Sequence, residues 1–250
     1  MSETVHTGNL FRVALNYADG RRRSRPVSIH DGRAILPQLS LDRQGFVLRH
    51  HETAVSNFYD AAEVRAVYYP EVEELLKTVT GATKVLAFEH DVRDASRSGV
   101  RDVREPVHVV HDDYTEKSAP ERVRLYLPGE ADTLLRHRFA VINVWRPIKG
   151  PVLDTPLAVC DAQSLAAEDL IPTSDGVKHE VYLFNFSLDH RWFYFPAMRT
   201  DEALLLKCFD SMRDGRARFT AHTAFDDPST PPDAPARESI EVRALAFFHE

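Results

Sequence analysis

The chain has 250 residues, of which 43% are hydrophobic and 10% aromatic, and its formal net charge is −7. This length and composition allow a full core to be buried, and we expect one domain over residues 1–250. The negative charge argues against a general nucleic-acid role, although residues 21–25 (RRRSR) form a local basic cluster. We interpret that cluster as a solvated turn, because a phosphate- or carrier-protein-facing patch would be expected to carry interleaved aromatic residues.

No apolar run of about 18 residues occurs, and the N-terminus lacks an apolar segment before a small-residue cleavage site. We therefore expect no membrane span, no secretory signal and a cytoplasmic protein. Cys160 and Cys208 lie in apolar, strand-like runs without Cys-x-x-Cys spacing, which favours buried thiols over a disulfide or a zinc site. Base rates favour a homodimer.

Residues 1–56 resemble an N-terminal β-extension. Strands are predicted at residues 10–17 and 26–30 around a turn at 18–20, with a third at 45–50. The triplet His50-His51-Glu52 offers a competing metal pair, but no partner ligand follows it at a familiar spacing.

The pattern changes over residues 57–80, where apolar residues recur at helical spacing with glutamates between them. This predicts a supporting amphipathic helix pair broken near Pro70 and ended at Gly81. Residues 84–90 then read as a strand. The charged stretch 91–105 is either a functional loop or lid, or a disordered excursion.

Residues 107–115 (VHVVHDDYT) place a histidine and a carboxylate two residues apart in a β-branched run. Side chains alternate across a strand, so His111 and Asp113 are predicted to share a face with Val107 and Val109. Such a pair could fill two positions of a metal. With 12 histidines in the chain, one His-x-Asp is expected by chance, and a solvated or hydrogen-bonded pair is the simpler interpretation of the spacing alone.

Helical or irregular segments at 120–127 and 131–137 precede a predicted strand at 139–146. On that strand Asn143 and Trp145 share a face. If this face lines a pocket, both would contact substrate or cosubstrate, and otherwise Trp145 is a core residue. Arg146 takes the opposite face, although Pro147 could turn it. Asn143, Trp145 and Arg146 are therefore the candidate substrate-binding residues.

Further strands are predicted at 156–160, 180–186, 191–195, 203–209, 217–225 and 237–247. In the last of these, Arg237, Ser239, Glu241 and Arg243 share the polar face, which is either an outer surface or the lining of a polar pocket. Many short strands with Gly, Pro and Asp turns predict a mainly β (α+β) fold: a double-stranded β-helix, or cupin-like jelly roll, with flanking helices. This architecture would bring the His111 and His222 strands together.

Four stretches resemble the CmcJ/AsaB-type hydroxylase and desaturase family, which includes cephalosporin hydroxylase components and fungal gibberellin-desaturase-like proteins. They are FAVINVWRP at 139–147, DEALLLKCFDS at 201–211, AHTAF at 221–225 and the final strand at 237–247. The likeness extends from about Gly45 onward. The order His-x-Asp, distal His and Arg-x-Ser is that of Fe(II)- and 2-oxoglutarate-dependent oxygenases.

The resemblance implies that His111, Asp113 and His222 bind Fe(II), and that Arg237 and Ser239 anchor 2-oxoglutarate. A long loop before Arg237 leaves Arg243 as the alternative anchor. The implied reaction uses O2, releases succinate and CO2, and hydroxylates or desaturates a small-molecule intermediate of secondary metabolism. Two alternatives are a cupin-like non-redox metalloenzyme, such as an isomerase or hydrolase, and a non-catalytic binding protein with a degenerate barrel.

Overall fold

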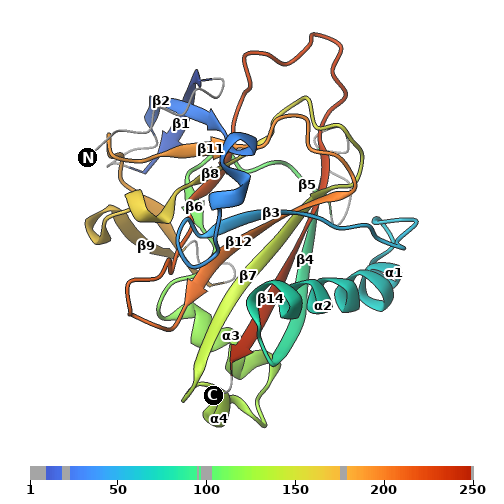
Figure 1. The fold of residues 1–250 in the computed structure, drawn as a ribbon, viewed down its shortest axis with the longest axis vertical. Coiled ribbons are helices and arrows are strands. Elements are labelled where there is room, and N and C mark those ends of the chain that lie inside the picture. Colours follow the sequence, from blue (N-terminus) through green and yellow to red (C-terminus); the bar gives the residue numbers. More distant parts are fainter. Residues whose placement is uncertain (1–9, 19–22, 95, 97–102, 175–178, 249–250) are drawn as a thin grey trace.

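The computed structural model describes residues 10–18, 23–94, 96, 103–174 and 179–248, and its strands form two sheets (Figure 1). One sheet, here called sheet A, contains β1 (Leu10–Tyr17), β2 (Arg23–Asp31), β6 (His111–Asp112), β8 (Leu157–Cys160), β9 (Leu170–Ser174), β10 (Glu180–Phe184), β11 (Trp192–Tyr194) and β13 (His222–Ala224). The other, sheet B, contains β3 (Phe46–His50), β4 (Lys84–Asp94), β5 (Val103–Arg104), β7 (Arg138–Pro147), β12 (Glu202–Asp210) and β14 (Glu238–Phe248).

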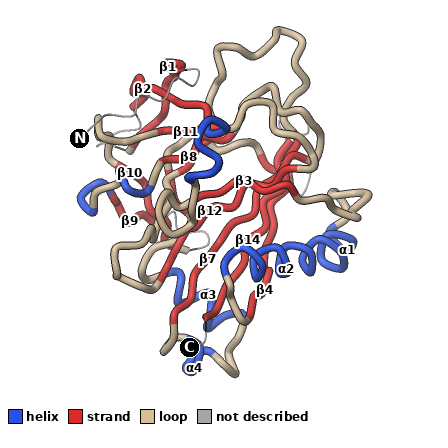
Figure 2. Tube along the Cα trace, in the orientation of Figure 1, coloured by secondary structure: helices blue, strands red, loops and turns tan. Residues whose placement is uncertain are grey.

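The strand order is β1-β2-β11-β8-β13-β6-β10-β9 in sheet A and β3-β12-β7-β14-β4-β5 in sheet B. Neighbouring strands come from distant parts of the chain. For example, β13 pairs with β6, and β14 pairs with both β4 and β7. The helical segments lie at the periphery of these sheets (Figure 2). The predicted jelly-roll core with flanking helices is confirmed.

The α-helices are α1 (Ala61–Glu63), α2 (Tyr69–Thr80), α3 (Ser118–Tyr126) and α4 (Ala131–Leu134). Short 3-10 turns cover Gly32–Gln38, Ala162–Ser164 and Ala167–Asp169. Within the described part of the chain, none of the helices has the length and apolar character needed to cross a membrane.

Helix α2 covers sheet B. It packs against β4 and β14, and its buried residues Val72 and Leu76 belong to the same apolar core as Val242 and Ala244 of β14. Since residues alternate along β14, this arrangement directs Arg237, Ser239, Glu241 and Arg243 to the opposite face. The polar face of β14 therefore faces sheet A.

The predicted break in the helix at Pro70 is wrong. A π-helical turn, Val64–Tyr68, joins α1 to α2 without interruption. Pro70 lies just after this π-helical turn, in which Tyr69 N–H donates to Val64 O, and the wider turn carries the helix past the proline without a break. The predicted end is confirmed, because Gly81 adopts a left-handed conformation with φ of 72° and caps α2.

Most predicted strands are present, but the two that carry the candidate ligands are shorter than expected. The His111 strand spans His111–Asp112 only, and the His222 strand spans His222–Ala224 only. Residues 107–110 lie beside sheet A but are not a strand of it. The Asn16 side chain donates to His108 O at 2.7 Å, and Val110 N donates to Asn16 O. Strand β9 was not predicted.

Other expectations have mixed outcomes. Cys160 and Cys208 are buried free thiols, as expected. The charged stretch 91–105 is partly regular, since β4 extends to Asp94 and β5 begins at Val103. Residues 19–22, which include two of the five residues of the basic cluster and two of the three of the predicted turn, lie outside the described residues.

Candidate active site

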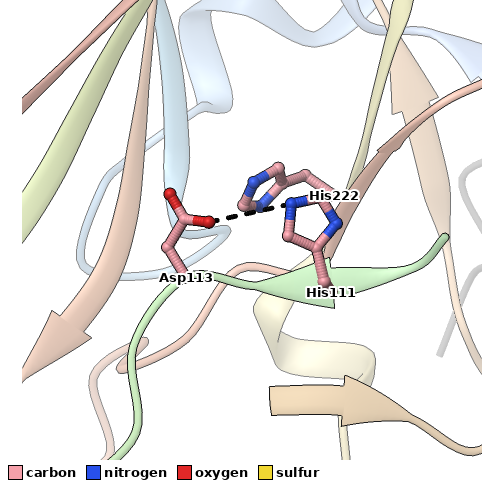
Figure 3. Close-up of side chains that lie close together, drawn as sticks. All are labelled: His111, Asp113 and His222. Atoms are coloured by element: carbon pink, nitrogen blue, oxygen red, sulfur yellow. Dashed lines mark ion pairs between the residues drawn. The ribbon is translucent and has the colours of Figure 1, made fainter. Parts of the chain in front are cut away.

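Three side chains from distant positions converge between the two sheets. His111 and His222 are paired directly across β6 and β13, and Asp113 follows β6 by one residue. Each offers a ligand atom, and these atoms all lie within 4.8 Å of one another. His111 Nε2 lies 3.7 Å from Asp113 Oδ1, and the two imidazole centroids are 4.4 Å apart (Figure 3). The structure thus brings together the three residues that the sequence singled out.

Each imidazole is oriented by a backbone carbonyl two residues earlier. His111 Nδ1 lies 2.7 Å from Val109 O, and His222 Nδ1 lies 2.9 Å from Thr220 O. A carbonyl oxygen can only accept, so Nδ1 is the protonated nitrogen in both rings. In the neutral form each Nε2 then carries a free lone pair, as metal coordination requires. Burial, and next the neighbouring His222, lower the pKa of His111 to about 3, which keeps that ring neutral.

Asp113 is the anionic member of this group. Its Oδ2 accepts hydrogen bonds from Asn143 Nδ2 at 2.8 Å and from Arg243 Nε at 2.9 Å. Burial alone would raise the pKa of Asp113, but the charge of Arg243, followed by the two histidines, outweighs it and holds that pKa well below its ordinary value. The site therefore presents two imidazole nitrogens and one carboxylate.

A second polar group lies beside the histidines. Arg237 and Ser239 are buried, and neither Arg237 Nε nor Ser239 Oγ has a hydrogen-bond partner among the described residues. Arg237 donates to Thr155 O at 2.5 Å, and its guanidinium carbon lies 5.5 Å from the Trp145 ring centroid. Burial, and next the charge of Arg93, lower the pKa of Arg237 to about 9. Buried donors without partners are costly, so this pair has the chemistry of an anion-binding site.

Arg237 also shares a small cavity with the metal-ligand candidates. His111, His222 and Trp145 line the same cavity as Arg237. Trp145 therefore faces the anion side of the site, and not a solvent-exposed surface. Arg237 therefore lies beside the two candidate histidine ligands.

Arg243, the alternative anchor, has its donors already in use. In addition to Asp113, it donates to Asp91 Oδ2 at 2.8 Å and to Glu241 Oε1 at 3.0 Å. All three guanidinium nitrogens thus bond to carboxylates. Arg237 is the arginine on this face that has an unpartnered donor.

A cavity of about 680 Å³ also borders His111 and Asp113. Such a volume is typical of a small-molecule site. Its walls include Val107, Val109 and Val181, and its polar lining includes the residues Asn16, Arg93, Arg104, His108 and His179. The sequence analysis missed those polar residues; the only available signal was the concentration of charge in the stretch 91–105.

Two of the candidate substrate-binding residues, Asn143 and Arg146, make contacts within the protein. Asn143 faces the site but contacts Asp113, not the open cavity. Arg146 lies on the opposite face of β7, as strand alternation requires, where it donates to His51 O at 3.0 Å and to Thr200 O. Its guanidinium carbon is 5.4 Å from the Tyr68 ring centroid, so Arg146 stabilises the packing of the helical segment.

Another buried group shares His222. Asp112, Cys208 and His222 also bring ligand-type atoms within 4.8 Å of one another. Neither carboxylate oxygen of Asp112 makes a regular hydrogen bond. These two groups are the ones found among the described residues, and neither includes His50 or Glu52.

Known proteins resemble this chain over most of its length. A family model described as "Oxidoreductase/YMDC permease-like domain" matches residues 9–247. The chain is 35% identical to "Hydroxylase/desaturase efuI" of Hormonema carpetanum, over 91% of this chain and 85% of the relative. It is 36% identical to "Alpha-ketoglutarate-dependent dioxygenase phiK" of a fungal species, over 92% and 87% of the two chains.

A solved structure gives the same result. The fold matches that of the "iron and alpha-ketoglutarate-dependent endoperoxidase NvfI" with a TM-score of 0.85 and 30% identity, over 96% of this chain and 99% of that one. Alpha-ketoglutarate is 2-oxoglutarate. The likeness thus spans the sheets, the ligand triad and the Arg237 strand together. The chain belongs to the Oxidoreductase/YMDC permease-like family, and the proteins that it resembles are named hydroxylase/desaturase, alpha-ketoglutarate-dependent dioxygenase and iron and alpha-ketoglutarate-dependent endoperoxidase.

Proposed function

We propose that this protein is a non-haem Fe(II)- and 2-oxoglutarate-dependent dioxygenase that hydroxylates or desaturates a small-molecule intermediate of natural-product biosynthesis. One observation carries the proposal. A triad of two histidines and one carboxylate borders both a cavity of about 680 Å³ and the small cavity lined by the buried Arg237, whose Nε has no partner among the described residues.

The triad suits Fe(II). His111 Nε2, His222 Nε2 and Asp113 Oδ1 form the two-histidine, one-carboxylate face that leaves further coordination positions open on a non-haem iron. The Nδ1–H bonds to Val109 O and Thr220 O fix both rings before any ion arrives. Such outer contacts orient the ligands and raise their basicity.

The Arg-x-Ser pair suits the distal carboxylate of 2-oxoglutarate. Arg237 Nε and Ser239 Oγ have no protein partner, and a carboxylate would accept from both in charge-assisted contacts. Arg237, His111 and His222 line one small cavity, so a dicarboxylate held by Arg237 would lie beside the metal ligands.

Bound iron, 2-oxoglutarate and O2 supply the oxidising power to remove hydrogen from an unactivated C–H bond, with succinate and CO2 as coproducts. The protein positions the substrate and excludes water. Val107, Val109 and Val181 offer an apolar wall to the substrate, and His108 and His179 offer polar contacts beside it. Placement of the substrate in this cavity would decide between hydroxylation and desaturation.

Purified protein supplied with Fe(II) tests the proposal. We expect 2-oxoglutarate to be converted to succinate with consumption of O2, and His222→Ala to abolish the conversion while thermal unfolding stays near that of the wild type. His50→Ala is the matched control, because the His50 side chain is 64% exposed and lies outside the triad. Stoichiometric metal binding without O2 consumption would favour a non-redox metalloenzyme, and absence of metal binding would favour a binding protein.

A further inference from the structure

The two oxygens of Asp113 have unequal surroundings. Oδ2 accepts two hydrogen bonds, from Asn143 Nδ2 and Arg243 Nε, at 2.8 and 2.9 Å. Oδ1 accepts none from the described residues and points toward His111 Nε2, 3.7 Å away. An ionised carboxylate has lone pairs on both oxygens and could otherwise hold a metal with either one or both.

We propose that Asn143 and Arg243 are positioning residues that keep Asp113 a one-oxygen ligand of the iron. This inference rests on the proposed function and adds an assignment to it. Both donors engage the Oδ2 lone pairs, so only Oδ1 is left to the metal.

The backbone makes this arrangement firm. Asn143 and Arg243 are direct partners in the register of β7 and β14, so their side chains leave the sheet on the same face. Because ionised Asp113 can only accept, the amide of Asn143 must direct its NH2 group toward it. Arg243 cannot turn away easily, since Asp91 and Glu241 hold its other two nitrogens.

Counting coordination positions shows why one oxygen matters. Six-coordinate iron with two imidazoles and one carboxylate oxygen keeps three positions open, which suffices for a two-point cosubstrate and O2. If Asp113 bound through both oxygens, only two positions would remain. The cosubstrate would fill them, and O2 would have no place. The two donors to Oδ2 therefore keep one coordination position of the iron available for O2.

The same contacts separate the roles of two arginines on one strand face. Arg243 contacts the metal carboxylate and has no free nitrogen, whereas Arg237 has an unpartnered Nε and lies beside Ser239. Loss of Arg243 should therefore act on iron binding even without cosubstrate. Loss of Arg237 should act on 2-oxoglutarate alone.

The test measures Fe(II) affinity of the full chain anaerobically, by competition with a coloured chelator, before 2-oxoglutarate is added. The visible charge-transfer band is then recorded after its addition. We expect Asn143→Ala and Arg243→Met each to weaken Fe(II) binding about 10- to 100-fold and to shift that band. Arg237→Met should change Fe(II) affinity less than about twofold, while weakening 2-oxoglutarate binding.

The outcomes are distinguishable. If wild-type protein binds no Fe(II), or gives no band with 2-oxoglutarate, the proposed function fails. If the wild type binds both normally and Asn143→Ala matches it in affinity and spectrum, the positioning role is overturned and the proposed function stands. Because Arg243→Met leaves Asp91, Asp113 and Glu241 without their shared cation, its folding is checked first. Asn143→Ala, which changes no charge, decides the question if that variant does not fold.

Discussion

Sheets A and B meet at the ligand triad and differ in the regularity that each brings to it. Sheet A supplies His111 and His222 from strands of only 2 and 3 residues. Sheet B supplies Asn143 and Arg243 from strands of 10 and 11 residues. The ligands tolerate short strands because each imidazole is fixed locally, by a carbonyl two residues earlier. The groups that orient Asp113 from across the site need the rigid platform of sheet B.

The largest expected effect is on Fe(II) affinity, and it follows from changing the ligand that comes directly after β6 of sheet A. Asp113→Asn removes the anionic ligand while keeping its shape, so Fe(II) affinity should fall by more than about 100-fold, beyond the range for residues that only orient a ligand. Chelator competition measures the affinity, and thermal unfolding checks the fold. Asp132→Asn, an exposed change on α4, is the matched control. An unchanged affinity in Asp113→Asn would remove Asp113 from the ligand set.

The second-largest expected effect is on the KM for 2-oxoglutarate, and it tests Arg237, next to β14 of sheet B. Arg237→Met should raise the KM for 2-oxoglutarate by about 30-fold, since truncating one partner of a buried charge pair costs about 2 kcal/mol or more. Steady-state succinate formation gives the value. Arg243→Met should raise the KM for 2-oxoglutarate less than Arg237→Met does when Fe(II) is saturating. The reverse ranking of these variants would move the anchor to Arg243.

A smaller effect lies in sheet A away from the triad. Tyr17 bonds through its hydroxyl to Trp192 Nε1 at 2.8 Å and His190 Nδ1 at 3.0 Å, and His190 Nε2 lies 3.0 Å from Asp169 Oδ2. Tyr17→Phe leaves two buried polar groups without this partner, and should lower the free energy of unfolding by about 1–2 kcal/mol. Denaturant unfolding measures the loss.

Tyr17→Phe also tests whether the outer part of sheet A influences the ligand site. Iron affinity of Tyr17→Phe should equal that of the wild type, because none of these residues lines the ligand site. Tyr194→Phe, another buried tyrosine of sheet A, is the control and should cost less than about 0.5 kcal/mol. A fall in iron affinity with Tyr17→Phe would show that the outer part of sheet A and the site are coupled.

The smallest effect depends on pH. Glu202, the first residue of β12, accepts from Arg33 Nη1 at 2.7 Å and Nη2 at 2.8 Å. Burial opposes this, but the Arg33 hydrogen bonds lower the pKa of Glu202 from 4.5. A lowered folded-state pKa adds stability above about pH 4.5, which is lost as pH falls through the folded value.

Glu202→Gln should therefore lower the melting temperature at pH 7 by an amount equivalent to less than about 1 kcal/mol, because the pair is partly exposed. The difference from wild type should shrink below pH 4.5. Melting curves across pH 3–7 check this, within the range where both proteins refold. A difference that grows on acidification would contradict the assigned sign.

The fold could be predicted in outline because the long strands of sheet B have clear patterns. The alternation over β7 and β14 gave the correct faces, including the shared face of Arg237, Ser239 and Arg243. The helical break predicted at Pro70 was wrong, because the π-helical turn that accommodates the proline has no pattern of its own in the sequence. The family resemblance is confirmed by the relatives over most of the chain.

The site could be predicted only in part. His111, Asp113 and His222 were singled out, and the structure brings them together, yet the expected long strand around His111 does not form. The hydrogen bonds of Asn143 and Arg243 to Asp113 depend on the distance between sheets, which no local pattern encodes. Arg146 was included although alternation alone places it on the other face. The cavity's polar lining comes from several separated segments, and spacing within any one of them gives no signal.

The most direct test of the central claim is a crystal structure of the protein grown anaerobically with Fe(II) and 2-oxoglutarate, with anomalous scattering recorded at the iron edge. We predict one iron peak about 2 Å from His111 Nε2, His222 Nε2 and a single oxygen of Asp113, with the distal carboxylate on Arg237 and Ser239. An iron peak at Asp112 and Cys208, or none near His111, would contradict the account.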